Sequence, residues 1–79
     1  MANVIIYSTP TCGFCDMAKA YFRENNVAFT EKDVMMDEAA RAEMLNKSQQ
    51  MGVPVIDING KIIVGFDQPR IASALGENA

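Results

Sequence analysis

Two short apolar runs joined by Asn59-Gly60 constrain the fold of this chain more than any other feature. The runs, residues 53–58 and 61–64, are rich in the β-branched side chains that favour strands. Asn-Gly readily adopts the positive φ angles that a two-residue hairpin turn requires. The sequence therefore predicts an antiparallel hairpin, and with it a fold that contains a sheet.

The first half of the chain alternates strand and helix patterns. Residues 4–7 are β-branched or aromatic and predict a buried strand, after which a turn-forming segment follows. From Cys12 to about Asn25-Asn26 apolar residues recur at helical spacing, and residues 27–34 return to a strand pattern. Two strands joined through a helix pack in parallel with a right-handed crossover, so we expect a βαβ unit.

Two further helices complete the pattern. One is predicted from Asp37 to about Lys47, and a short final one is capped by Asp67, has Pro69 in its first turn and stops at Gly76. The residues expected to face the core are Met36, Ala40 and Met44 in the first, and Ile71, Ala72 and Leu75 in the second. The order βαβαββα predicts an α/β fold with a four-stranded mixed sheet flanked by three helices.

Length and composition restrict both the number of domains and the function. A chain of 79 residues supports one core, so residues 1–79 are predicted to form a single domain, and we expect a monomer. The net charge of −3 and the scattered basic residues argue against a nucleic-acid partner. Neither a signal-peptide pattern nor a stretch of roughly 20 apolar residues is present, which predicts a cytoplasmic protein that does not enter a membrane.

The spacing of Cys12 and Cys15 indicates redox chemistry. A disulfide between them closes too short a loop to stabilise the fold much. Cys12 falls at the predicted helix start, where unpaired N–H groups and the helix dipole favour the thiolate of a side chain whose free pKa is near 8.5. Cys15 lies almost one turn further along, toward the core. We therefore expect Cys12 to attack disulfides and Cys15 to resolve the mixed disulfide.

Two other interpretations of the cysteine pair stay open at this point: a pair of inert buried cysteines, and part of a metal site. A zinc or iron–sulfur site needs roughly four nitrogen or sulfur ligands, whereas the chain has 2 cysteines and no histidine. We therefore predict no metal site within one chain. A cluster could form only between subunits or with added thiols.

Three segments resemble the signature segments of bacterial glutaredoxins and of the similar NrdH-type redoxins, in order and in spacing. They are Tyr7-Ser8-Thr9-Pro10-Thr11-Cys12-Gly13-Phe14-Cys15, Gly52-Val53-Pro54-Val55 and Gly65-Phe66-Asp67. The resemblance covers essentially the full chain and implies a thioredoxin fold and a glutathione-dependent thiol–disulfide oxidoreductase. It implies no tightly bound cofactor, with glutathione as reductant and substrate and disulfide-containing proteins as further substrates.

The resemblance also implies which residues bind glutathione or substrate. Pro54 matches a cis-proline that faces the attacking cysteine and turns the Val53 main chain toward an extended ligand, although a proline that merely starts an edge strand is the alternative. The segment from Gly65 to Gln68 matches the part that binds the γ-glutamyl end of glutathione at a helix N-terminus. Within it, Asp67 also fits a simple N-cap, and Phe66 either covers the ligand or packs beneath it. The implied set is Thr9, Phe14, Val53, Pro54, Gly65, Phe66, Asp67 and Gln68, with no metal ligand.

The chain departs from typical glutaredoxins beside these segments. Thr9 and Gln50 replace basic residues that usually hold the glycyl carboxylate of glutathione, and Lys47 is the nearest substitute in sequence. Each missing cation removes a charge-assisted hydrogen bond of roughly 1.5–3 kcal/mol. The Gly13-Phe14 pair between the cysteines is typical of neither group. Beside a glutathione-dependent oxidoreductase, the sequence therefore leaves two alternative functions. One is an NrdH-like redoxin reduced by thioredoxin reductase, with ribonucleotide reductase as a target, and the other is a non-catalytic iron–sulfur cluster carrier.

The methionines and helix acids fit ordinary structural roles. We expect Met17, Met36 and Met44 to pack in the core and Met51 to lie beside the active site. The acids Asp37, Glu38 and Glu43 are predicted to form a solvated helix face.

Overall fold

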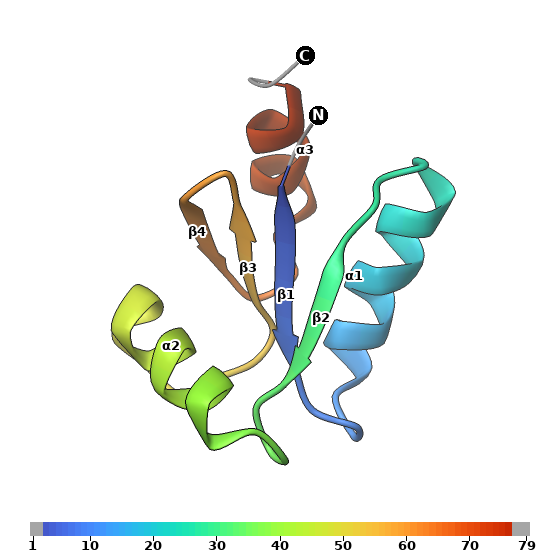
Figure 1. The fold of residues 1–79 in the computed structure, drawn as a ribbon. Helices are drawn as coiled ribbons and strands as arrows, with labels where there is room; N and C mark the ends of the chain where they lie inside the picture. The colour runs from blue at the N-terminus through green and yellow to red at the C-terminus, as the bar shows by residue number, and fades with distance from the viewer. Residues whose placement is uncertain (1–2, 77–79) are drawn as a thin grey trace.

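The computed structural model describes residues 3–76 and confirms the predicted α/β fold (Figure 1). Its elements, in chain order, are β1 (Val4–Ser8), α1 (Gly13–Glu24), β2 (Thr30–Asp33), α2 (Glu38–Ser48), β3 (Val55–Ile58), β4 (Lys61–Val64) and α3 (Gln68–Gly76). The strands form one four-stranded sheet in the order β2-β1-β3-β4. β1 is parallel to β2, whereas β3 is antiparallel to both β1 and β4. Because α1 follows β1 directly, its N-terminus lies at the carboxyl end of a central strand.

The predicted hairpin is confirmed, and its turn shows why Asn59-Gly60 favours it. Both residues have positive φ, 51° at Asn59 and 93° at Gly60, as a type I′ turn requires. The Gly60 N–H donates to Asp57 Oδ1 at 2.7 Å, which fixes the turn to β3. β3 begins at Val55 and not at residue 53, because Pro54 has no N–H to donate to a neighbouring strand.

The second strand also begins later than predicted, at Thr30 instead of residue 27. In the parallel register Thr30 lies opposite Ile5, near the start of β1, so earlier residues have little strand to pair with. Asn26 has a φ of 58°, and the Val27 N–H donates to the Phe22 carbonyl at 2.8 Å. The asparagine pair thus closes α1 as predicted, and Val27 packs against the core from the connection.

Apolar side chains pack on both faces of the sheet. One face, covered by α1 and α3, holds Val4, Ile6, Ala18, Phe22, Ile56, Ile58, Ile63, Ile71 and Ala74. The other, covered by α2, holds Tyr7, Val34, Ala40, Met44 and Val55. Ala72 was expected in the core but is exposed, because the buried face of α3 continues from Ile71 through Ala74 and Leu75 at i+3 and i+4. Within residues 3–76, no helix is long and apolar enough to cross a membrane.

A polar network attaches α2 to the sheet. The buried Tyr7 hydroxyl donates to Glu43 Oε1, and Lys47 Nζ donates to the Tyr7 oxygen and to Asp57 Oδ2, both at 2.7 Å. Lys32 adds an ion pair to Glu43 at 2.9 Å. The hydrogen bonds from Tyr7 and Lys32 lower the pKa of Glu43 to about 2. The Glu43 side chain is 38% exposed, so it is partly solvated as predicted, but it also has partners on the sheet that the sequence did not indicate. Lys47 likewise already has partners within the fold.

We expect Lys47→Met to destabilise the protein through this network. The substitution removes the cationic partner of Asp57, which is only 8% exposed, and a donor to the Tyr7 hydroxyl. Because a buried charge without its partner is costly, the free energy of unfolding should fall by about 2–3 kcal/mol, somewhat less than for a fully buried pair. Urea unfolding measures the change.

The matched control for Lys47→Met is Arg41→Ala, which breaks a longer and more exposed pair on the same helix, with Arg41 Nη2 3.8 Å from Glu38 Oε1. Its loss should cost less than about 0.5 kcal/mol. Equal losses for the two variants would contradict the role given to the network.

Candidate functional site

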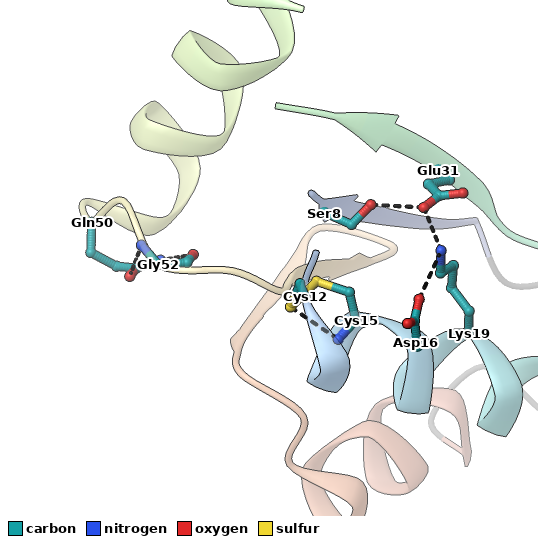
Figure 2. Close-up of a disulfide and its surroundings, with 8 residues drawn as sticks. All are labelled: Ser8, Cys12, Cys15, Asp16, Lys19, Glu31, Gln50 and Gly52. Atoms are coloured by element: carbon teal, nitrogen blue, oxygen red, sulfur yellow. Dashed lines mark hydrogen bonds and ion pairs between the residues drawn. A yellow bond between two sulfur atoms is a disulfide. The ribbon is translucent and has the colours of Figure 1, made fainter. Parts of the chain in front are cut away.

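Cys12 and Cys15 lie at the N-terminal end of α1 and are joined as a disulfide, with their Cα atoms 5.2 Å apart (Figure 2). Cys12 is the N-cap residue, with extended backbone angles of φ −94° and ψ 108°. Its Sγ accepts a hydrogen bond from the Cys15 N–H at 3.1 Å, and its own N–H donates to the Thr9 carbonyl at 3.3 Å. The helix predicted to start at the cysteines therefore starts with a sulfur atom as its cap.

The two sulfur atoms have different surroundings. Cys12 is partly exposed, whereas Cys15 is fully buried with Ala18 and Phe22 on the core side of α1, as predicted. Negative charge on Cys12 Sγ is stabilised by the Cys15 N–H and by the positive end of the helix dipole. Burial penalises the same charge on Cys15. This arrangement suits Cys12 to attack from the surface and Cys15 to act only within the molecule.

A groove of about 320 Å³ brings together most of the residues that the sequence implicated. Its lining consists of Phe14, Val53, Pro54, Val64, Gly65, Phe66 and Asp67. They come from α1, from the loop before β3 and from the connection between β4 and α3. Val64 was missed, although its position gives a signal: it ends β4 and alternates with the buried Ile63, so it faces away from the core.

The loop before β3 is joined to the connection after β4. The Val53-Pro54 peptide bond is cis, as the resemblance implied. The Pro54 carbonyl accepts a hydrogen bond from the Gly65 N–H at 2.8 Å, and Gly65 has a φ of 84°, a conformation that favours glycine. Among residues 3–76 no group is hydrogen-bonded to the main chain of Val53, so its N–H and C=O are available to an extended ligand.

Asp67 and Phe66 serve the fold and line the groove at once. Asp67 Oδ1 accepts from the Arg70 N–H at 3.3 Å, so the predicted N-cap is present. Phe66 packs against the core and meets Tyr21 edge to face, with ring centroids 6.1 Å apart. Asp67 therefore caps α3 and also lines the groove, and Phe66 packs on the core and also lines the groove.

Positive charge is absent from the described lining of this groove, where Asp67 is the one ionisable side chain. The Gln50 side chain is hydrogen-bonded within its own loop. Its Oε1 accepts from the Gly52 N–H at 2.6 Å, and its Nε2 donates to the Gly52 carbonyl at 3.0 Å. Thr9 and Gln68 lie outside the groove, in the connection before α1 and at the exposed start of α3. Six of the eight implicated binding residues thus share the groove, and these two do not.

Two of the methionines that were predicted to pack in the core are exposed. Met17 is 51% exposed and shares a shallow hollow with Gly13 and Phe14, and Met36 is 79% exposed. Met36 precedes α2 in a turn where its N–H donates to Asp33 Oδ1 at 3.2 Å. The predictions that Met17 and Met36 are core residues are therefore wrong. Met44 is buried as expected.

Within residues 3–76, no three side chains of the types that bind metals are grouped closely enough to hold an ion. The described lining of the groove beside the two cysteines is largely apolar.

The comparisons with known proteins agree with this geometry. The glutaredoxin family model matches residues 4–63. A glutaredoxin-like 8.6 kDa protein of the rubredoxin operon of Clostridium pasteurianum is 48% identical over 84% of this chain and 88% of its own length. Glutaredoxin 3 of Escherichia coli K12 is 38% identical over 96% of this chain and 92% of its own.

Solved structures also match the fold of this chain. The crystal structure of the thioredoxin-like protein BC3987 superposes with a TM-score of 0.86 at 30% identity, covering 91% of this chain and 99% of that one. The thioredoxin fold implied by the sequence is therefore confirmed. With the cysteine pair at the helix cap and a family match that spans both the pair and the cis-proline loop, the chain belongs to the glutaredoxin family.

Proposed function

We propose that this protein reduces disulfides of proteins and mixed disulfides of glutathione, with Cys12 as the attacking thiol and Cys15 as the resolving one. The observation that carries the proposal is the cap geometry, in which Cys12 Sγ accepts the Cys15 N–H at 3.1 Å. Membership of the glutaredoxin family implies thiol–disulfide oxidoreductase activity. We place the reaction in the cytoplasm, without a resident cofactor.

The reaction uses two successive thiol–disulfide exchanges. The Cys12 thiolate attacks one sulfur of the substrate disulfide, and the electron pair of the broken bond leaves on the other sulfur, which becomes a thiol. Cys15 then loses its proton and attacks Cys12 Sγ, which releases the second substrate thiol and forms the Cys12–Cys15 disulfide. Two molecules of glutathione restore both thiols and leave as glutathione disulfide.

The groove offers a place for an extended ligand beside Cys12. The ligand main chain would pair with the free N–H and C=O of Val53, next to Pro54 and beneath the exposed Phe14 ring. The γ-glutamyl end of glutathione would lie along Gly65–Gln68, where the start of α3 presents N–H groups to a carboxylate. Thr9 would border the glycyl end without supplying a charge.

A second candidate differs only in the electron donor. The groove has no basic side chain in its described lining, and Gln50 is held by Gly52, so the glycyl carboxylate of glutathione lacks its usual partner. This observation supports reduction by thioredoxin reductase as the second candidate, for which we propose a target such as ribonucleotide reductase. The exchange chemistry at Cys12 is the same for both donors.

A coupled turnover assay separates the two donors. The substrate is a small mixed disulfide of glutathione, and NADPH consumption is followed with either glutathione plus its reductase or thioredoxin reductase alone. We expect turnover with glutathione, and we expect Cys12→Ser to abolish it because no other thiol is exposed in the described fold. Turnover only with thioredoxin reductase would identify the second candidate, and turnover by Cys12→Ser would contradict the proposed chemistry.

Restoring one cation should strengthen glutathione binding. In Thr9→Lys the new ammonium can reach the glycyl carboxylate, and one charge-assisted hydrogen bond should raise kcat/KM for the glutathione mixed disulfide by about tenfold. Ala20→Lys adds the same charge at an exposed position of α1, outside the groove, and should leave kcat/KM unchanged. Equal kcat/KM values for the two variants would contradict the placement of the glycyl end beside Thr9.

A further inference from the structure

The outer edge of β4 borders a second groove, away from the cysteine pair. In the described fold β4 is the last strand of the sheet and pairs on one side only, with β3 (Figure 1). The groove has a volume of about 320 Å³ and is formed by β4 and α3. Its lining consists of Lys61, Ile62, Ile63, Arg70, Ser73 and Ala74. The disulfide chemistry described above uses none of these residues.

The hydrogen-bond pattern of the hairpin shows which main-chain groups of β4 point to the open edge. The two-residue turn makes Lys61 and its partner on β3 a hydrogen-bonded pair, and such pairs alternate along antiparallel strands. The Gly65 N–H, four residues after Lys61, donates to the Pro54 carbonyl at 2.8 Å and continues this alternation. The N–H and C=O groups of Ile62 and Val64 therefore point away from β3.

The two faces of β4 carry side chains of different character. Ile62 and Val64 share the face that α2 covers, where Ile62 packs against the core and Val64 is 47% exposed. Lys61 shares the α3 face with the buried Ile63. Side chains of a strand added to this edge would alternate in the same way. One set would lie beside Lys61, and the other beside Ile62 and Val64.

Arg70 adds a second positive charge on the α3 side of this groove. The residue is exposed, and among residues 3–76 no carboxylate forms an ion pair with its guanidinium. The described lining contains no acidic side chain, although the whole chain has a net charge of −3. The groove therefore attracts carboxylates and disfavours a basic ligand.

We propose that β4 is a docking edge for an extended segment of a partner protein in which acidic and apolar side chains alternate. The main chain of this segment pairs with Ile62 and Val64 as an added strand. Its acidic side chains point toward Lys61 and Arg70, and its apolar side chains cover Ile62 and Val64. A lysine on an edge strand also opposes unselective pairing, so the same residue discriminates between strands.

The docking edge leads to the groove beside the cysteine pair. Val64 ends β4 and lines that groove together with Gly65. A partner protein bound along β4 is therefore held next to Cys12. Binding at the edge does not depend on the disulfide chemistry, whereas delivery of a partner's disulfide to Cys12 rests on the proposed function.

An NMR titration of the oxidised protein with short peptides tests the docking edge. The probe is Glu-Val-Glu-Val-Glu, blocked at both ends and free of cysteine, so that no disulfide exchange occurs. We expect the amide signals of Ile62 and Val64 to shift as the peptide is added, because both N–H groups gain an acceptor. Glu-Glu-Glu-Val-Val has the same composition without the alternation and should bind at least about tenfold more weakly.

Two charge-reversal variants test the recognition of the acidic side chains. Arg70→Glu should weaken binding of the alternating peptide at least about tenfold, because a like charge replaces the opposite one. Arg41→Glu changes the net charge by the same amount at a site on α2 outside the groove, and it should weaken binding less than about twofold.

Three results would overturn the docking edge. The first is equal affinity for the two peptides or equal weakening by the two variants. The second is an absence of shifts at Ile62 and Val64, including the case in which only signals of the groove beside the cysteines move. The third is a shift of the same two signals with protein concentration alone, which would show that a second copy of this chain occupies the edge. Because the titration involves no thiol, a failure of the proposed redox activity would leave its result unchanged.

Discussion

The N-terminal end of α1 carries main-chain N–H groups that no helical carbonyl satisfies, and Cys12 Sγ accepts one of them, from Cys15, at 3.1 Å. The contact requires α1 to begin where β1 ends, and that position is fixed by Cys15, Ala18 and Phe22 packing on the sheet. The apolar core thus places a hydrogen-bond donor against one sulfur while it buries the other. Because of this placement, the Cys12 and Cys15 side chains differ in chemical surroundings although they are the same type of residue.

The two faces of the sheet hold two polar groups of different character. On the α2 face, a network attaches α2 to the sheet through the side chains of Tyr7, Glu43, Lys47 and Asp57. The residues that α2 itself buries are Ala40 and Met44. On the α1 face, Ser8 and Glu31 lie at the end of the sheet where the cysteines are. The network also holds the Lys47 ammonium away from the groove, so the same contacts that attach α2 leave the described lining of the groove without a positive charge.

Local patterns predicted the elements of this fold well. The Asn59-Gly60 turn, the asparagines that end α1 and the cap at Asp67 each depend on a few adjacent residues, and the structure contains all three. The partners of Glu43 could not be predicted, because they come from β1 and β2, which sequence spacing does not bring near α2. Met17 and Met36 were misjudged because an apolar side chain is buried only where another element covers it. Val64 lines the groove because side chains alternate between the two faces along β4. Its position could be predicted only once the register of β4 is known.

The alkylation rate of each cysteine tests most directly the claim that the cap of α1 makes Cys12 the reactive thiolate. The reduced protein is treated with iodoacetamide at about pH 6, where a free cysteine with a pKa near 8.5 is almost entirely protonated. Peptide mapping then gives a rate constant for each site. We expect Cys12 to react at least about tenfold faster than Cys15 and than an unstructured cysteine peptide. Equal rates at the two sites, or faster alkylation of Cys15, would contradict the claim.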